Sequence, residues 1–413
     1  MKTLPILLLV ALFSVSSNLY AQEELCDCKS DLLFLDSKIR KMPAYKREKA
    51  NYKKAFELSL KKSSSITSIF DCTVLLNTLM LSINDNHSHV YSLNDGATTE
   101  IKENAESYNT FKNSSFFHIY PKPNVSLDSL KQVLSEKSKT EIEGIYHNKN
   151  KGVLGVYKSK DKSAYRVIML EPFTDMWQEG EIISHVVPYG EDNFLQVGGS
   201  IQSKSLTAFS ERFEDGFLFS LNLQKDPNEI NFSNLQHSDE TYYREEISDD
   251  ISYIKVGSFN SWYPTLSDAE TFYSTLDGTL TKKNLIIDLR YNPGGGDRNS
   301  NVLFKILKDY SKSNRIFVLT NHETASNAEQ FTKKLSDLPN SIILGKTTYG
   351  ALSYEIKGES YAFPSGDFYA ILTSKTHSKY LKYESIGVRP DIELDLHEDW
   401  IDQASRIIKE TKN

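Results

Sequence analysis

One run of residues limits the possible folds more than any other part of this chain. Residues Asn284–Gly296 read Asn-Leu-Ile-Ile-Asp-Leu-Arg-Tyr-Asn-Pro-Gly-Gly-Gly, an apolar segment that ends in three glycines. A short apolar run of this kind is typical of a strand buried inside a sheet, and the glycines predict a tight turn. Further along the chain, a short polar stretch follows another predicted strand, and Ser326 then opens a predicted amphipathic helix.

The C-terminal half of the chain alternates between predicted strands and predicted helices. Strands are expected at 251–256, 285–289, 316–319 and 342–344, and helices at 265–279, 298–310 and 326–336. Such alternation is typical of an α/β layer structure with largely parallel strands.

The rest of the chain differs in pattern and suggests further domains, as its 413 residues also do. We expect a signal peptide at 1–21, an N-terminal helical region at 22–90, a linker at 91–140 with one helix near 127–137, a β-rich domain at 141–235 and an α/β domain at 240–413. The short β-type runs between 141 and 224 indicate a small antiparallel sheet or barrel.

The N-terminus carries the marks of an export signal. Lys2 precedes an almost entirely apolar segment, Leu4–Val15, and Ala21 offers a small residue for cleavage. The segment is too short to span a membrane, so we expect an exported protein, periplasmic or extracellular, without a membrane span. The net charge of -7, without any basic block, argues against a nucleic-acid partner.

Export makes a disulfide bond plausible for the three cysteines. The sequence pairs Cys72 with either Cys26 or Cys28 and leaves the third cysteine over. No histidine stands near them at the spacing of a zinc site, so no metal centre is predicted.

Ser326 and the glycine turn together suggest acyl-transfer chemistry. A serine at the start of a helix is typical of an N-cap, but it also exposes a hydroxyl where the helix dipole favours negative charge. Backbone N–H groups of Gly294 or Gly295, together with that of Asn327, are candidate donors to the oxyanion of a tetrahedral intermediate.

A serine nucleophile needs a base with a pKa near neutrality, and histidine supplies one. His87, in the polar turn Asn84–His89, is the candidate base, and His89 is its competitor. A third group should orient the base, and Glu384 is the candidate acid.

Four motifs resemble the C-terminal processing peptidase family, which includes the tail-specific proteases and the tricorn core peptidase. They are Asn284–Gly296, Thr324–Glu329, Gly345–Gly350 and Gly387–Asp391, which occur in the order seen in that family. The resemblance covers roughly residues 250–395 and the turn Asp85–His87. It implies a crotonase-like α/β catalytic domain and serine peptidase activity on peptide or unfolded protein substrates, with no metal or cofactor.

The resemblance also assigns roles to single positions. Ser326 falls at the nucleophile of the family, but Ala351 stands where the processing-protease branch has its lysine base, and Lys346 lies on the other side of that turn. His87 and Glu384 match the base and the acid of the tricorn-like branch, although Asn86 replaces a serine of that branch. The histidine branch is therefore favoured.

Three functions remain open at this point. The first is an exported serine peptidase of the histidine branch. The second is a catalytically inactive relative that binds peptides or an envelope protein, and the third is an esterase or acyl-transfer enzyme that uses the same serine.

Overall fold

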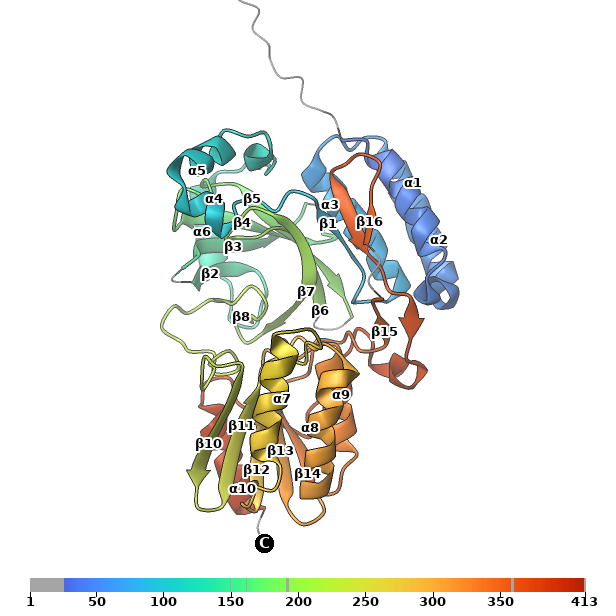
Figure 1. The fold of residues 1–413 in the computed structure, drawn as a ribbon. Helices are drawn as coiled ribbons and strands as arrows, with labels where there is room; N and C mark the ends of the chain where they lie inside the picture. The colour runs from blue at the N-terminus through green and yellow to red at the C-terminus, as the bar shows by residue number, and fades with distance from the viewer. Residues whose placement is uncertain (1–25, 149, 161, 191–192, 358–359, 412–413) are drawn as a thin grey trace, which may run out of the picture.

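The computed structural model of the chain describes residues 26–148, 150–160, 162–190, 193–357 and 360–411 (Figure 1). The predicted signal peptide, residues 1–21, lies outside this range. The described chain has two parts: an upper part, with N-terminal helices and a barrel, and a lower α/β part (Figure 1). None of the described helices has the length and apolar character needed to cross a membrane.

A six-stranded sheet forms the middle of the α/β part, in the order β10-β11-β12-β13-β14-β19. Its strands are β10 (Tyr242–Ser248), β11 (Ile251–Val256), β12 (Asn284–Asp288), β13 (Arg315–Thr320), β14 (Ser341–Gly345) and β19 (Ile392–Glu393). The edge strand β10 is antiparallel to β11, and the other neighbouring pairs are parallel. The predicted strands and their parallel arrangement are confirmed.

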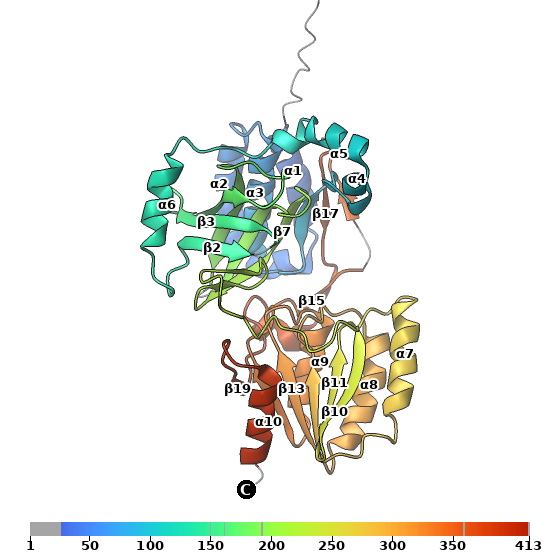
Figure 2. The same ribbon diagram turned by 90° about the vertical axis from the view of Figure 1, so that its left-hand side faces the viewer.

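Helices cover both faces of this sheet. Helices α7 (Thr265–Leu276), α8 (Asp297–Tyr310) and α9 (Asn327–Ser336) lie on one face, and α10 (Trp400–Glu410) lies on the other (Figure 2). Successive side chains of a strand point to opposite faces, so Leu285 and Ile287 pack with α7–α9 while Ile286 packs with α10. Burial on both faces explains the continuous apolar run in the sequence.

The β-type runs between residues 141 and 224 form a closed barrel of antiparallel strands. The strands are β2 (Gly144–Asn148), β3 (Gly152–Lys158), β4 (Tyr165–Pro172), β5 (Ile182–Tyr189), β6 (Asn193–Gly199), β7 (Leu206–Glu214), β8 (Phe217–Leu218) and β9 (Leu223–Gln224). Pairing of His147 with Gln224 closes the barrel. Its apolar core continues into the helices that precede it.

Three helices precede the barrel at the N-terminal end: α1 (Cys28–Ile39), α2 (Pro43–Ser63) and α3 (Ile69–Met80). A disulfide bond between Cys28 and Cys72 joins α1 to α3, which decides between the two pairings left open by the sequence. Cys26 is a buried free thiol.

The predicted linker is wrong in one respect, because it contains helices α4 (Thr99–Glu103) and α5 (Ala105–Lys112) besides the expected one, α6 (Leu127–Ser135). Side chains of Thr98 and Asn104 cap the two unexpected helices. These helices bury almost none of their side chains, so they lack the apolar period by which a helix is recognised in a sequence.

Residues 354–376 leave the α/β part and join the N-terminal helices. Two of their strands, β16 (Ser360–Ala362) and β17 (Phe368–Ile371), form a sheet with β1 (His89–Ser92), while β15 (Tyr354–Glu355) pairs with β18 (Lys375–Thr376). Aromatic side chains of this segment share a core with α1–α3. The predicted α/β domain, 240–413, includes these residues, because strand pairing over such a separation leaves no local signal in the sequence.

Candidate active site

Ser326 lies at a sharp turn between β13 and α9. Its backbone has φ 56° and ψ -122°, a conformation that is strained for any residue except glycine. Its Oγ lies 2.9 Å from Nε2 of His87. The hydroxyl thus meets a potential base in a strained turn, an arrangement typical of serine nucleophiles.

The turn that holds His87 is fixed by a buried carboxyl group. Asp85 accepts hydrogen bonds from the His87 backbone N–H (3.0 Å), from the Ser88 hydroxyl (2.9 Å) and from the Thr373 hydroxyl (2.5 Å). The Thr373 backbone N–H in turn donates to Ser88 Oγ. Thr373 lies two residues after the end of β17, so the pairing of β1 with β17 helps to position His87 next to the nucleophile.

The imidazole of His87 sits among buried groups. Burial, followed by the neighbouring charges of His89 and His377, lowers its pKa to about 4. Its Nδ1 is buried, and no described residue supplies it with a hydrogen-bond partner. One ring nitrogen and one oxygen each of Asp85 and Glu384 all lie within 4.8 Å of one another, so any positive charge on the ring would form beside two carboxyl groups.

Glu384 lies next to His87 but bonds to the backbone around it. Its carboxyl oxygens accept the N–H groups of Asn86 (3.0 Å) and Ser353 (2.8 Å). Burial, and then the charge of Asp85, raises its pKa to about 8. Within the described residues it makes no hydrogen bond to the His87 ring, so it holds the base through the chain at Asn86.

The three candidate oxyanion donors lie at one place but differ in availability. A Cβ atom on Gly294 would come within 2.7 Å of the Asn327 backbone nitrogen and 2.8 Å of Ser326 Cβ, so only glycine fits there. The Gly294 N–H donates to Asn292 Oδ1 (2.9 Å) and is therefore occupied. The N–H groups of Gly295 and Asn327 have no acceptor among the described residues.

Glu329 holds the serine turn to its surroundings, and the sequence analysis did not single it out. Its buried carboxylate accepts four hydrogen bonds, two at each oxygen: from Thr348 Oγ1 and Gly350 N, and from Ser326 N and Ala351 N. Burial raises its pKa to about 7, against these four bonds. A glutamate three residues after a helix-initiating serine is a capping-box signature, and that signal could have found it.

Neither Lys346 nor His89 reaches the nucleophile. Lys346 Nζ forms ion pairs with Glu214 (2.5 Å) and Glu393 (3.3 Å), away from Ser326. His89 Nε2 lies 3.0 Å from the carbonyl oxygen of Asn86. Ala351 is buried. The structure therefore brings together Ser326 and His87, and no lysine of the described residues is hydrogen-bonded to Ser326.

The barrel also contributes to the site, which the sequence did not reveal. Asn86 Nδ2 donates to Tyr189 Oη (3.1 Å) at the end of β5 and contacts the carbonyl oxygen of Gly350 (3.3 Å). Ser210 of β7 donates its backbone N–H to Tyr349 Oη (2.7 Å), and its hydroxyl bonds to Tyr189. The barrel thus braces the turn that precedes His87.

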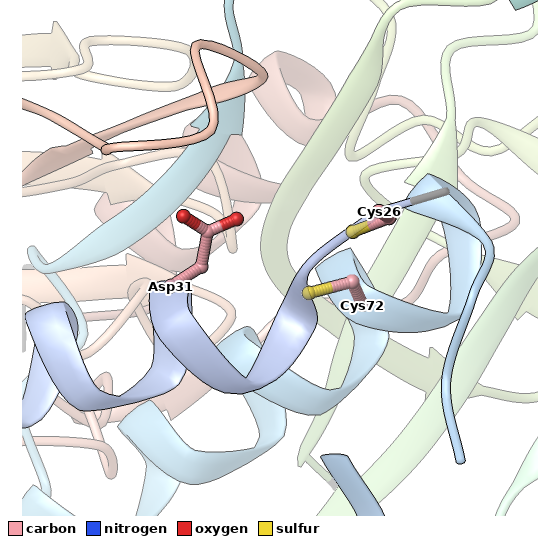
Figure 3. A group of neighbouring side chains, drawn as sticks. All are labelled: Cys26, Asp31 and Cys72. Atoms are coloured by element: carbon pink, nitrogen blue, oxygen red, sulfur yellow. The ribbon is translucent and has the colours of Figure 1, made fainter. Parts of the chain in front are cut away.

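Away from Ser326, the side chains of Cys26, Asp31 and Cys72 lie close enough together to be potential metal ligands (Figure 3). Cys72 is already bonded to Cys28, so its sulfur is not available as a thiolate ligand. The cluster is therefore a structural part of the N-terminal helices.

The α/β part of the chain matches a known protein family. Residues 250–313 and 297–394 match the model of peptidase family S41. The resemblance to the C-terminal processing peptidases, predicted from four motifs, is thereby confirmed. Comparison with curated proteins gives no match.

Comparison with solved structures finds several similar chains, all at low identity. Mature CPAF has a TM-score of 0.46 and 12% identity, covering 93% of this chain and 96% of that chain. The photosystem II D1 C-terminal processing protease has a TM-score of 0.37 and 13% identity, covering 93% and 97%. The tricorn protease has a TM-score of 0.42 and 15% identity, covering 94% and 37%.

Proposed function

We propose that the chain hydrolyses peptide bonds through an acyl-enzyme on Ser326, with His87 as the base. The premise is that residues 250–394 belong to peptidase family S41 and that the chain is a serine-type peptidase. The observation that carries this proposal is the 2.9 Å separation of Ser326 Oγ and His87 Nε2. At that distance the imidazole can take the hydroxyl proton during attack.

The reaction follows from the positions of these groups. Ser326 Oγ attacks the scissile carbonyl carbon while His87 Nε2 takes its proton, and the carbonyl oxygen becomes an oxyanion held by the N–H groups of Gly295 and Asn327. Collapse of the intermediate breaks the C–N bond, and His87 returns the proton to the leaving amine. Water then repeats the sequence on the acyl group and frees Ser326.

The two carboxyl groups behind His87 support its charge change. Asp85 and Glu384 lie within 4.8 Å of the ring, so a negative charge on either stabilises the imidazolium formed during acylation. Because they also lie close to each other, ionising both at once is unfavourable, and this repulsion adds to the larger effect of burial in raising the pKa of Glu384. This arrangement supports the proposal that the chain belongs to the histidine, tricorn-like branch.

The proposal extends to fold and location. We place the sheet β10–β14 with helices α7–α10 as a crotonase-like catalytic unit, with the helical and barrel regions as separate domains. Export to the periplasm or the cell exterior is supported by the Cys28–Cys72 disulfide, since such bonds persist in oxidising compartments.

Covalent labelling tests the proposal directly. The mature protein is treated with a fluorophosphonate serine probe, and intact mass is measured alongside cleavage of denatured casein. We expect one adduct in the wild type and in the surface control Ser313→Ala, and none in Ser326→Ala. We also expect His87→Ala to lose both labelling and cleavage, whereas the surface control His237→Ala keeps them.

Each outcome selects one function. Labelling with cleavage of esters but not of peptides would support the esterase alternative. A folded wild type that neither takes up the probe nor cleaves casein would overturn the peptidase and leave the peptide-binding relative. One observation favours the peptide-binding relative: among the described residues, Glu384 makes no hydrogen bond to the His87 ring.

A further inference from the structure

Two aromatic side chains stand out in the loop between β11 and α7. Trp262 is 79% exposed and Tyr263 is 66% exposed, the two highest values for large apolar side chains in the described part of the chain. Adjacent aromatic side chains left in solvent are unfavourable in isolation, and they are common where a protein binds an apolar partner.

This loop is attached to the glycine turn of the active site. The Phe259 N–H donates to the Gly294 carbonyl oxygen, and the Gly296 N–H donates to the Phe259 carbonyl oxygen, both at 2.9 Å. Phe259 also forms a parallel bridge with Gly295. The backbone of the loop is therefore bonded on both sides of the residue proposed to hold the oxyanion.

Side chains fix the part of the loop that carries the two aromatic rings. Asn260 Oδ1 accepts the Trp262 N–H (3.0 Å), and its carbonyl oxygen accepts Asn299 Nδ2 of α8 (2.9 Å). The Arg298 guanidinium lies over the Tyr263 ring, 5.8 Å from its centroid. A loop held in this way loses little conformational freedom when it binds.

The glycine turn lies next to both this loop and the nucleophile. A Cβ atom on Gly296 would lie 2.7 Å from Ser261 Oγ, and one on Gly294 would lie 2.8 Å from Ser326 Cβ. Both α7 and α9 begin at the end of the sheet that faces the barrel (Figure 1). The aromatic pair therefore borders the active site, across the turn from Ser326.

We propose that Trp262 and Tyr263 form an apolar subsite that binds a large hydrophobic side chain of the polypeptide substrate close to the scissile bond. The inference rests on the proposed peptidase function and names its substrate class: unfolded or extended polypeptide segments rich in aromatic and aliphatic residues. Folded proteins bury such side chains, so the subsite selects against them. Tryptophan and tyrosine suit the role because they offer large contact areas with few rotatable bonds.

A matched pair of peptides tests the subsite. The two fluorogenic peptides differ in a single residue near the cleaved bond, which is phenylalanine in one and serine in the other. The comparison is repeated with this residue placed at different positions along the peptide. In the double variant Trp262→Ala/Tyr263→Ala, kcat/KM for the phenylalanine peptide should fall about tenfold to a hundredfold, through KM, since burying one aromatic side chain has that value. The serine peptide should change less than about threefold, by the same reasoning.

Controls separate this effect from general damage. Phe173→Ala removes another exposed aromatic side chain, 61% exposed, from the barrel side and should leave both peptides unchanged. The single variant Trp262→Phe should keep part of the preference for the phenylalanine peptide that the double variant loses. The fluorophosphonate labelling rate of the double variant should equal that of the wild type, because the probe does not need the subsite.

Three results would overturn the inference. The first is an equal fall in kcat/KM for both peptides, and the second is no fall for either. The third is a wild type that forms a dimer and a double variant that is monomeric but keeps the same peptide preference. If the wild type cleaves neither peptide and takes up no probe, the proposed function fails by itself. The subsite is then tested by binding of the uncleaved phenylalanine peptide, measured by fluorescence anisotropy. The double variant must bind this peptide more weakly than the wild type does.

Discussion

Replacing Glu329 by glutamine should weaken both the fold and the active site by a predictable amount. In the wild type, four donors share two carboxylate oxygens, and one of them is the Ser326 backbone N–H. The glutamine side chain keeps one oxygen and replaces the other with an NH2 group that can only donate. The better orientation keeps the bonds to Ser326 and Ala351 and turns the NH2 group toward Thr348 and Gly350.

The expected magnitude follows from that count. Thr348 can reverse its hydroxyl and accept, but the Gly350 N–H is left buried without an acceptor, at about 1–3 kcal/mol. The two remaining bonds change from charged to neutral and lose roughly 1 kcal/mol together. Glu329→Gln should therefore reduce the free energy of unfolding by about 2–4 kcal/mol, and Glu329→Ala, which leaves four donors unpaired, by at least about 4 kcal/mol.

The same series predicts the reactivity of Ser326. Its backbone strain is worth about 1–3 kcal/mol and persists only while the turn is held. Release of the Ser326 N–H in Glu329→Ala should lower the fluorophosphonate labelling rate roughly 5- to 150-fold, by that same energy. The conservative variant keeps the bond and should lose less than about tenfold.

Urea unfolding and timed labelling measure these quantities, with the exposed Glu270→Gln on α7 as a matched control. A Glu329→Ala protein that unfolds at the wild-type urea concentration and labels at the wild-type rate would refute the reasoning. So would a reversed order of the two variants, because the number of unpaired donors sets the order.

Three further predictions concern the base, its competitor and the disulfide bond. Since the base must be neutral and the pKa of His87 is lowered to about 4, the labelling rate should stay level on acidification and halve only near pH 4, whereas a midpoint near the ordinary histidine pKa would contradict the burial argument. Lys346→Met should change the labelling rate less than about twofold, because Lys346 forms ion pairs away from Ser326; loss of labelling would instead point to a lysine base. Opening the Cys28–Cys72 bond with Cys28→Ser should reduce the free energy of unfolding by about 4 kcal/mol for a loop of this length, and the control Cys26→Ala should cost clearly less in the same urea titration.

The local parts of this protein can be predicted from its sequence. The run Asn284–Gly296 predicts a doubly buried strand and its turn because alternate residues meet two apolar layers. The position of Ser326 at the start of a helix follows from the periodicity of the residues around it. Both signals come from neighbours in the chain, so they survive in the sequence.

The contacts between distant segments, in contrast, depend on how the whole chain packs. His87 reaches Ser326 because β1 pairs with β17, and no periodicity encodes that long-range pairing. The choice of Cys28 over Cys26 likewise depends on how α1 packs against α3. The reactive residues of this chain thus lie in local motifs that can be recognised in the sequence. Their assembly into one site depends on contacts between residues hundreds of positions apart, which are set by packing and by buried hydrogen bonds.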